Sequence, residues 1–203
     1  MLRIGIYGGS FSPIHNGHIR AVKAFLEQMQ LDFCYVIPTF IPPHKAASGV
    51  IAPEHRIRMC ELAFKNMDGI VVSDIEIKRQ GTSYTVDTLR QLAGEDRRLF
   101  FLMGTDMLLT LDTWRSPDEI FKLCYPVYMR RESDSANDAR IIEKIADYRK
   151  KFGKTVMKIV ADPFEVSSTV IRNRLASGED VSSLIPLAVE AYIRENRLYL
   201  SEV

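Results

Sequence analysis

Short runs of β-branched and aromatic residues alternate along the chain with longer segments in which apolar residues recur every three or four positions. The short runs predict strands, and the helically spaced segments predict helices between them. The predicted strands lie at residues 2–7, 33–38, 70–74, 99–103, 127–130 and 156–160. Because strands that alternate with helices are typical of parallel sheets, the pattern predicts an α/β fold with an open, mostly parallel sheet and helices on both faces.

The expected helices present apolar faces that belong to the core. One face carries Ile19, Val22, Phe25, Leu26 and Met29; another carries Ile57, Cys60, Phe64 and Met67, and a third carries Ile141, Ile145, Tyr148 and Phe152. Pro53 is typical of a helix start. The last 40 residues also read as helical. We therefore expect a single domain over residues 1–203, with a sheet-and-helix core up to about 160 and a small C-terminal helical part over about 165–203.

Composition excludes several classes of protein. The chain has 203 residues, 46% of them hydrophobic, and 27 basic against 26 acidic residues give a formal charge of +1. This near-neutral charge disfavours a nucleic-acid-binding module. Three isolated cysteines without a C-x-x-C pair disfavour a disulfide framework and a zinc site. The first apolar run is too short for a signal peptide, and no stretch could span a membrane, so a cytoplasmic protein is expected.

A glycine-rich turn follows the first predicted strand and predicts a phosphate site. Gly8 and Gly9 are followed by His15, Gly17 and His18, and an amphipathic helix is expected to begin at the second histidine. Unpaired N–H groups and the helix dipole favour an anion at such a helix start. The dinucleotide pattern G-x-G-x-x-G is absent, so a hydride-transfer function is disfavoured.

Two further segments offer phosphate ligands. Lys45 lies in a predicted loop over residues 39–52, at the carboxyl edge of the sheet, where open α/β sheets bind ligands. Ser168 and Arg172 lie four residues apart and share a face of a helix's first turn. Each has a simpler alternative: Lys45 as a solvated surface residue, and the other pair as a helix cap with a surface arginine.

Segments 81–88 and 103–106, followed by Trp114, predict a site for a flat ring and a carboxylate. Hydroxyl and backbone N–H groups near Thr85 could receive a carboxylate, and the indole could stack on a heteroaromatic ring. Asp106 could accept hydrogen bonds from ribose hydroxyls. The alternatives are a core tryptophan and a helix N-cap aspartate.

Together these motifs resemble the bacterial nicotinate mononucleotide adenylyltransferase family, within the HxGH nucleotidylyltransferase superfamily. The resemblance rests on segments 8–18, 42–45, 81–88, 103–106 with Trp114, and 167–172, and it spans nearly the whole chain. It implies a Rossmann-like fold. Ser12 departs from the motif, because the family usually has Asp at this position.

The resemblance implies adenylyl transfer from ATP to nicotinate mononucleotide, giving nicotinate adenine dinucleotide and pyrophosphate in NAD biosynthesis. It implies that His18 contacts the α-phosphate and His15 the neighbouring phosphates, with Mg²⁺ held mainly through ATP phosphates. The remaining implied contacts are Gly9, Ser10, Phe11, Lys45, Ser168 and Arg172 for ATP and its phosphates, Gly104 and Asp106 for the nucleoside, and Tyr84, Thr85 and Trp114 for nicotinate.

Two alternatives stay open at this level. One is an adenylyl- or cytidylyltransferase for another phosphate acceptor, such as phosphopantetheine. The other is a non-catalytic nucleotide sensor on the same fold, which the departure at Ser12 keeps open. The sequence also leaves open a homo-oligomer.

Overall fold

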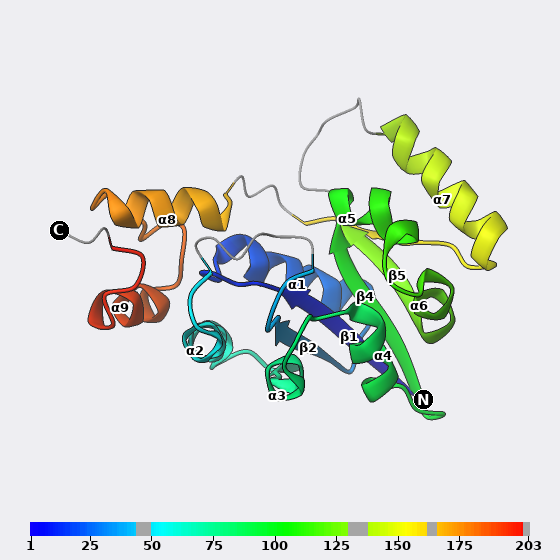
Figure 1. The fold of residues 1–203 in the computed structure, drawn as a ribbon, viewed down its shortest axis with the longest axis horizontal. Coiled ribbons are helices and arrows are strands. Elements are labelled where there is room, and N and C mark those ends of the chain that lie inside the picture. Colours follow the sequence, from blue (N-terminus) through cyan, green and yellow to red (C-terminus); the bar gives the residue numbers. More distant parts are fainter. Residues whose placement is uncertain (44–49, 130–137, 162–165, 201–203) are drawn as a thin grey trace.

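The computed structural model describes residues 1–43, 50–129, 138–161 and 166–200. Within these residues one six-stranded sheet has the order β3-β2-β1-β4-β5-β6, and every neighbouring pair is parallel (Figure 1). The strands are β1 (Leu2–Gly9), β2 (Phe33–Pro38), β3 (Ile70–Val72), β4 (Arg97–Gly104), β5 (Cys124–Met129) and β6 (Met157–Ile159). Each overlaps a predicted strand, although β3 ends two residues early. The predicted Rossmann-like α/β class is confirmed.

The connections between the strands are mostly helical. The helices are α1 (Asn16–Gln28), α2 (Pro53–Phe64), α3 (Ile75–Arg79), α4 (Thr85–Leu92), α5 (Thr105–Thr110), α6 (Pro117–Leu123), α7 (Asp138–Phe152), α8 (Ser168–Ala176) and α9 (Leu187–Glu195), with a 3₁₀ turn at Leu111–Thr113. Pro53 starts α2 as predicted. The predicted start of α1 was wrong by two residues, because His15 takes the extended N-cap conformation and the helix begins at Asn16.

Alternate residues of β4 separate the two halves of the core. Phe100 and Leu102 pack in one buried cluster with apolar side chains of α1, α2, α8 and α9. Phe101 and Met103 face the opposite way, into a second cluster with side chains of α4, α5, α6 and α7. Because successive strand residues point to opposite faces, this alternation shows that helices cover both sides of the sheet.

Gly5 in the middle of β1 sets how closely α1 approaches the sheet. A Cβ atom at this position would lie 2.7 Å from Leu31 Cδ1 and 2.8 Å from Phe25 Cε1. Such contacts are too short for real carbon atoms, so only glycine lets α1 and the turn after it pack directly on the strand. The close packing helps to fix the start of α1 relative to the end of β1.

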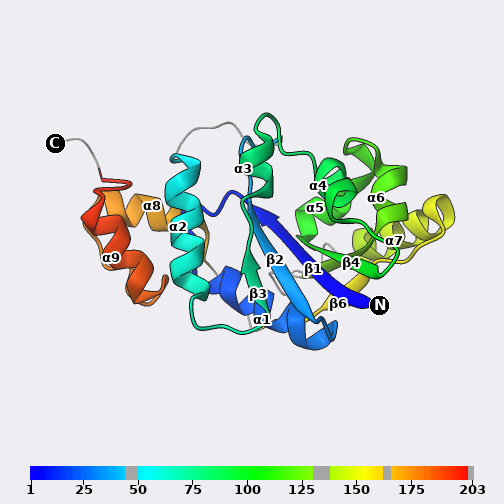
Figure 2. The ribbon, with the colours of Figure 1, turned by 90° about the horizontal axis from the view of Figure 1, so that it is seen from below.

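The C-terminal helices lie far from α7. Figures 1 and 2 show α8 and α9 beside α2 at one end of the molecule and α7 at the other. His55 of α2 and Tyr192 of α9 are joined by a hydrogen bond of 2.9 Å between Nδ1 and the hydroxyl. The division into a core and a C-terminal helical part stays a prediction. In the described ranges no helix is long and apolar enough to cross a membrane.

The strand order reverses between β1 and β4. From β1 the chain continues outward to β2 and β3, and it then returns to the other side of β1 through β4, β5 and β6. Ligands of open α/β sheets bind in the crevice at the carboxyl ends of the strands next to such a reversal. The end of β1, where the glycine-rich turn begins, lies at this point.

Candidate active site

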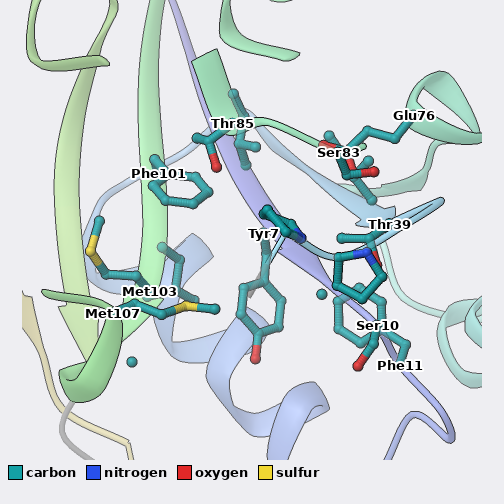
Figure 3. Close-up of a pocket in the computed structure, with 18 of the residues that line it drawn as sticks. Tyr7, Ser10, Phe11, Thr39, Glu76, Ser83, Thr85, Phe101, Met103 and Met107 are labelled. Atoms are coloured by element: carbon teal, nitrogen blue, oxygen red, sulfur yellow. The ribbon is translucent and has the colours of Figure 1, made fainter. Parts of the chain in front are cut away.

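A cavity of about 490 Å³ opens at the carboxyl edge of the sheet. Its walls come from the ends of β1, β2, β4 and β5, from residues that follow β1, β2 and β4, from α3 and α4, and from the start of α8. Figure 3 shows Phe101, Met103 and Met107 on one side and Ser10, Phe11 and Thr39 on the other. The volume is typical of a site for a nucleotide-sized ligand.

The loop between β1 and α1 takes an irregular path under the cavity. Phe11 has a φ of 45° and is 1% exposed, and the peptide bond between Ser12 and Pro13 is cis. The Phe11 ring lies over Gly9, where an added Cβ atom would come within 2.9 Å of it. The glycine therefore lets the Phe11 ring pack directly on the end of β1.

The two histidines are held as a pair at the start of α1. Their rings are stacked with centroids 3.6 Å apart, and the His18 and Phe11 rings form a T-shaped pair with centroids 5.1 Å apart. The backbone N–H of His15 donates to His18 Nδ1 at 3.2 Å. Since Nδ1 accepts a hydrogen bond, the proton of a neutral His18 ring is on Nε2. Both side chains line the cavity.

Residues of α8 hold the same loop from the far end of the sequence. Ser168 Oγ donates to the Pro13 carbonyl at 2.9 Å, and Arg172 Nη1 donates to the Ser12 carbonyl at 2.8 Å. Arg172 Nη2 also donates to Thr169 Oγ1 at 3.2 Å. These bonds use two of the five N–H groups of the guanidinium. Ser168 and Arg172 line the cavity with the histidines, so α8 and the start of α1 share one rim.

Arg56 supports the loop from below and was not predicted from the sequence. Its side chain is 1% exposed and donates to three carbonyls, those of Ser10 at 3.0 Å, Ile51 at 3.0 Å and Phe40 at 3.4 Å. Burial lowers the pKa of this guanidinium from its ordinary value. A buried cation therefore lies against the loop between β1 and α1, and no sequence signal separates it from a surface arginine of an amphipathic helix.

The residues predicted to receive nicotinate also line the cavity, beside the helices on the second face of the sheet. Tyr84 is the N-cap of α4, so Thr85 opens a helix whose first backbone N–H groups have no partner within the helix. Trp114 also lines the cavity, with its ring edge-on to Phe101 at 6.1 Å. Arg115 follows it, and the guanidinium carbon lies 4.6 Å from the centre of the Tyr84 ring. Sequence reasoning missed Arg115, although its place beside the predicted Trp114 could have indicated it.

A buried carboxyl group in the same wall was also missed. Glu76 of α3 is 5% exposed and reaches toward Ser83, as Figure 3 shows. Thr88 Oγ1 donates to its Oε1 at 2.6 Å, and Arg79 lies 3.9 Å away. Burial raises the pKa of this carboxyl, while the hydrogen bonds from Thr88 and Ser83 and the charge of Arg79 oppose the rise. In the sequence, Glu76 stands beside basic residues and resembles an ordinary surface charge.

The structure brings most of the predicted site residues together. The cavity is lined by Gly9, Ser10, Phe11, His15, His18, Tyr84, Thr85, Gly104, Trp114, Ser168 and Arg172. Asp106 instead lies in the exposed first turn of α5 and is not part of the lining. Lys45 falls outside the described residues, so its placement stays a prediction. The roles assigned to all of these side chains remain predictions as well.

Comparison with known proteins extends these observations. A family model described as "Cytidylyltransferase-like" matches residues 6–174. Among curated relatives, proteins named "Probable nicotinate-nucleotide adenylyltransferase" are 38% identical in Thermoanaerobacter sp. (strain X514) and 35% identical in Clostridium botulinum (strain Eklund 17B / Type B). The first alignment covers 98% of this chain and 94% of the relative, and the second covers both chains in full.

The fold is also similar to solved structures. The nicotinic acid mononucleotide adenylyltransferase of Plasmodium falciparum, complexed with APC in one structure and with NaAD in another, superposes with a TM-score of 0.78. Each alignment covers 98% of both chains at 20% identity, so this likeness concerns the fold.

The parallel sheet, the cavity at its carboxyl edge and the matching family model together define a cytidylyltransferase-like protein. The relatives narrow this class, because they align over almost the whole chain at more than 30% identity. The chain belongs to the nicotinate-nucleotide adenylyltransferase family. The resemblance drawn from the motifs is thus confirmed, together with its implication that the chain is a nucleotidyltransferase.

Proposed function

We propose that this protein transfers the adenylyl group of ATP to the phosphate of nicotinate mononucleotide, giving nicotinate adenine dinucleotide and pyrophosphate. The observation that carries the proposal is the lining of one cavity. It brings the histidine pair and Arg172, from the start of α1 and from α8 on one face of the sheet, together with Thr85 and Trp114 beside the helices of the other face. A triphosphate matches the first group and a flat ring with a carboxylate matches the second, and the relatives bear the name of this activity.

The reaction requires positioning more than proton transfer. A phosphate oxygen of nicotinate mononucleotide attacks the α-phosphorus of ATP, the bond to the bridging oxygen of the β-phosphate breaks, and pyrophosphate leaves. The attacking group is already an anion, so no general base is needed. His18 donates from Nε2 to an α-phosphate oxygen, where charge is concentrated in the transition state. His15 and the guanidinium of Arg172 hold the other phosphates.

The residues of the cavity fit a magnesium ion that binds together with the nucleotide. Among the described residues no group of three or more His, Cys, Asp or Glu side chains is placed to hold a metal ion. Mg²⁺ commonly binds through substrate phosphates and water with few protein ligands, and the guanidinium of Arg172 in the cavity lining suits a nucleotide of that kind. When bound, the ion would neutralise charge on the leaving pyrophosphate.

The acceptor end of the cavity favours the acid over the amide. The unpaired N–H groups at the start of α4 and the positive end of its dipole favour an anion near Thr85. Arg115 adds a cation to the same wall. Both groups stabilise a bound carboxylate, whereas they stabilise a neutral carboxamide much less.

The test uses the purified full chain with ATP and Mg²⁺ and compares three acceptors: nicotinate mononucleotide, its amide analogue and phosphopantetheine. Release of pyrophosphate and formation of the dinucleotide are measured together. We expect both products with the acid, and a kcat/KM at least tenfold lower with the amide. A tenfold preference for the amide, or turnover only with phosphopantetheine, would contradict the proposed acceptor. Absence of pyrophosphate with every acceptor would contradict the enzymatic function and leave the nucleotide sensor as the alternative.

A further inference from the structure

The C-terminal segment reaches the loop that carries the histidines. The hydroxyl of Tyr199 lies 2.9 Å from Ser12 Oγ, and the two groups are hydrogen-bonded across 187 residues of sequence. The backbone N–H of Ile51 donates to the same Ser12 oxygen at 3.4 Å. Ser12 is 1% exposed, so this contact is made inside the protein.

The backbone before Tyr199 takes an unfavourable path that delivers its side chain to this place. Arg197 and Tyr199 have φ values of 51° and 63°, in the left-handed region that is unfavourable for a residue with a side chain. Leu198 between them is buried in the core, and its N–H donates to the carbonyl of Ile193 at 2.9 Å. The core contact anchors the segment, and the turn directs Tyr199 toward the loop.

Tyr199 completes a set of restraints on the loop between β1 and α1. Arg56 holds the Ser10 carbonyl, and Arg172 and Ser168 hold the next carbonyls along the loop. Those contacts bind backbone carbonyls of the loop, whereas Tyr199 contacts the side chain of Ser12. Ser12 lies three residues before His15, which lines the cavity. Burial raises the pKa of the Tyr199 hydroxyl, so the group stays protonated and able to donate near neutral pH.

We propose that Tyr199 is a positioning residue for the phosphate site: through its hydrogen bond to Ser12 it fixes the β1–α1 loop and thereby the rings of His15 and His18. This inference rests on the proposed function and goes beyond it, because it makes the C-terminal end of the chain part of the apparatus that orients ATP. It also gives a role to Ser12, where the family usually has Asp.

The first experiment compares two tyrosines with the same kind of bond. Tyr199→Phe removes the hydroxyl that contacts the loop, and Tyr192→Phe removes the hydroxyl that joins α9 to His55 of α2. We expect Tyr199→Phe to lower kcat/KM for ATP about five- to tenfold, the effect of losing one hydrogen bond, while KM for nicotinate mononucleotide changes less than twofold. Both variants should lower the melting temperature by similar amounts, because each loses one hydrogen bond. Tyr192→Phe should leave kcat/KM for ATP and KM for nicotinate mononucleotide unchanged.

The second experiment tests whether Tyr199 acts through Ser12. Ser12→Ala and Tyr199→Phe are measured separately and together. If both variants break the same bond, the double variant has nearly the kcat/KM for ATP of the worse single variant. If the losses of kcat/KM in the two single variants multiply in the double variant, Tyr199 does not act through Ser12 and the proposal is overturned. A Tyr199→Phe enzyme that behaves like the Tyr192→Phe control would also overturn it.

Hydrogen–deuterium exchange of the peptide over residues 8–19 supplies a readout that needs no activity. Exchange should rise in Tyr199→Phe and stay at the wild-type level in Tyr192→Phe. If the wild-type protein makes no dinucleotide but this contrast holds, the proposed function fails and the positioning of the loop stands. If the wild-type protein is active and the two variants exchange alike, the inference about Tyr199 fails.

Discussion

The Nδ1 atom of the His18 ring accepts a hydrogen bond from the protein, and in the proposed mechanism its Nε2–H donates to the α-phosphate. Nδ1 is occupied by the His15 backbone N–H, and stacking on His15 restrains the plane of the ring. A donor aimed at the transition state is worth about 3 kcal/mol, so His18→Ala should lower kcat about a hundredfold with little change in KM. Steady-state kinetics measure both constants. His55→Ala, which removes a histidine outside the cavity lining, is the matched control and should keep its turnover. Near-normal turnover in His18→Ala would remove this residue from the mechanism.

Arg115 is the residue whose charge bears most directly on the choice of acceptor. Its side chain is 55% exposed, so solvent screens its effect on a bound carboxylate to about 1 kcal/mol or less. Arg115→Gln should therefore reduce the ratio of kcat/KM for acid over amide about three- to fivefold. Arg90→Gln is the control, because Arg90 pairs with the same Asp87 but lies outside the cavity lining. An unchanged ratio in Arg115→Gln would show that the start of α4 alone selects the acid.

At the scale of elements, Glu76 links α3 to α4. Since burial holds the pKa of this carboxyl above its ordinary value of about 4.3, the folded state binds the proton more tightly than the unfolded state. The free energy of unfolding must then fall as pH rises from the unfolded pKa through the folded one. In Glu76→Gln the free energy of unfolding should depend less on pH. The urea midpoint, measured at several pH values between 4 and 8, reports this dependence. Glu61→Gln, at an exposed pair with Arg58, should keep the wild-type slope. An equally steep fall in Glu76→Gln would contradict the assignment.

The helices and strands also differ in how well the sequence pattern predicts them. The strands and the longer helices α1, α2 and α7 follow from periodicity, because each repeats its apolar pattern over a full strand or over three turns or more. The short helices α3, α5 and α6 have 5, 6 and 7 residues and complete at most two turns. Helices of that length are not stable alone, so tertiary packing decides whether they form. The same applies to α4, whose residues read in the sequence as a binding motif and not as a helix.

At the scale of the molecule, the cavity rim contains residues from the start of α1 and from α8, which lie near opposite ends of the sequence. Nucleotide binding at this rim should therefore stabilise the whole fold. ATP at a hundred times its Kd adds about 2.7 kcal/mol, which corresponds to a rise in melting temperature of roughly 5–10 °C for a domain of this size. In Arg172→Ala a tenfold weaker Kd would remove about 1.4 kcal/mol, half of that rise at the same ATP concentration. Thermal unfolding with and without ATP measures the difference.

Arg174→Ala is the matched variant for that measurement. Arg174 lies on the same helix, pairs with Glu179 at 3.9 Å and does not line the cavity. It should show the full rise on adding ATP. If Arg172→Ala shows the full rise as well, α8 holds the loop but does not contact the nucleotide.

The amino-acid sequence by itself determined the class of fold, the strand segments and the glycine-rich turn with its two histidines. These features depend on local periodicity and on the conformations open to neighbouring residues, which a short stretch of chain already contains. Only the tertiary structure decided that Arg56 is buried under the loop, that Glu76 and Arg115 face the cavity, and that Tyr199 touches Ser12. Burial of a charged group and contact across 187 residues depend on how every element packs, so no local pattern records them.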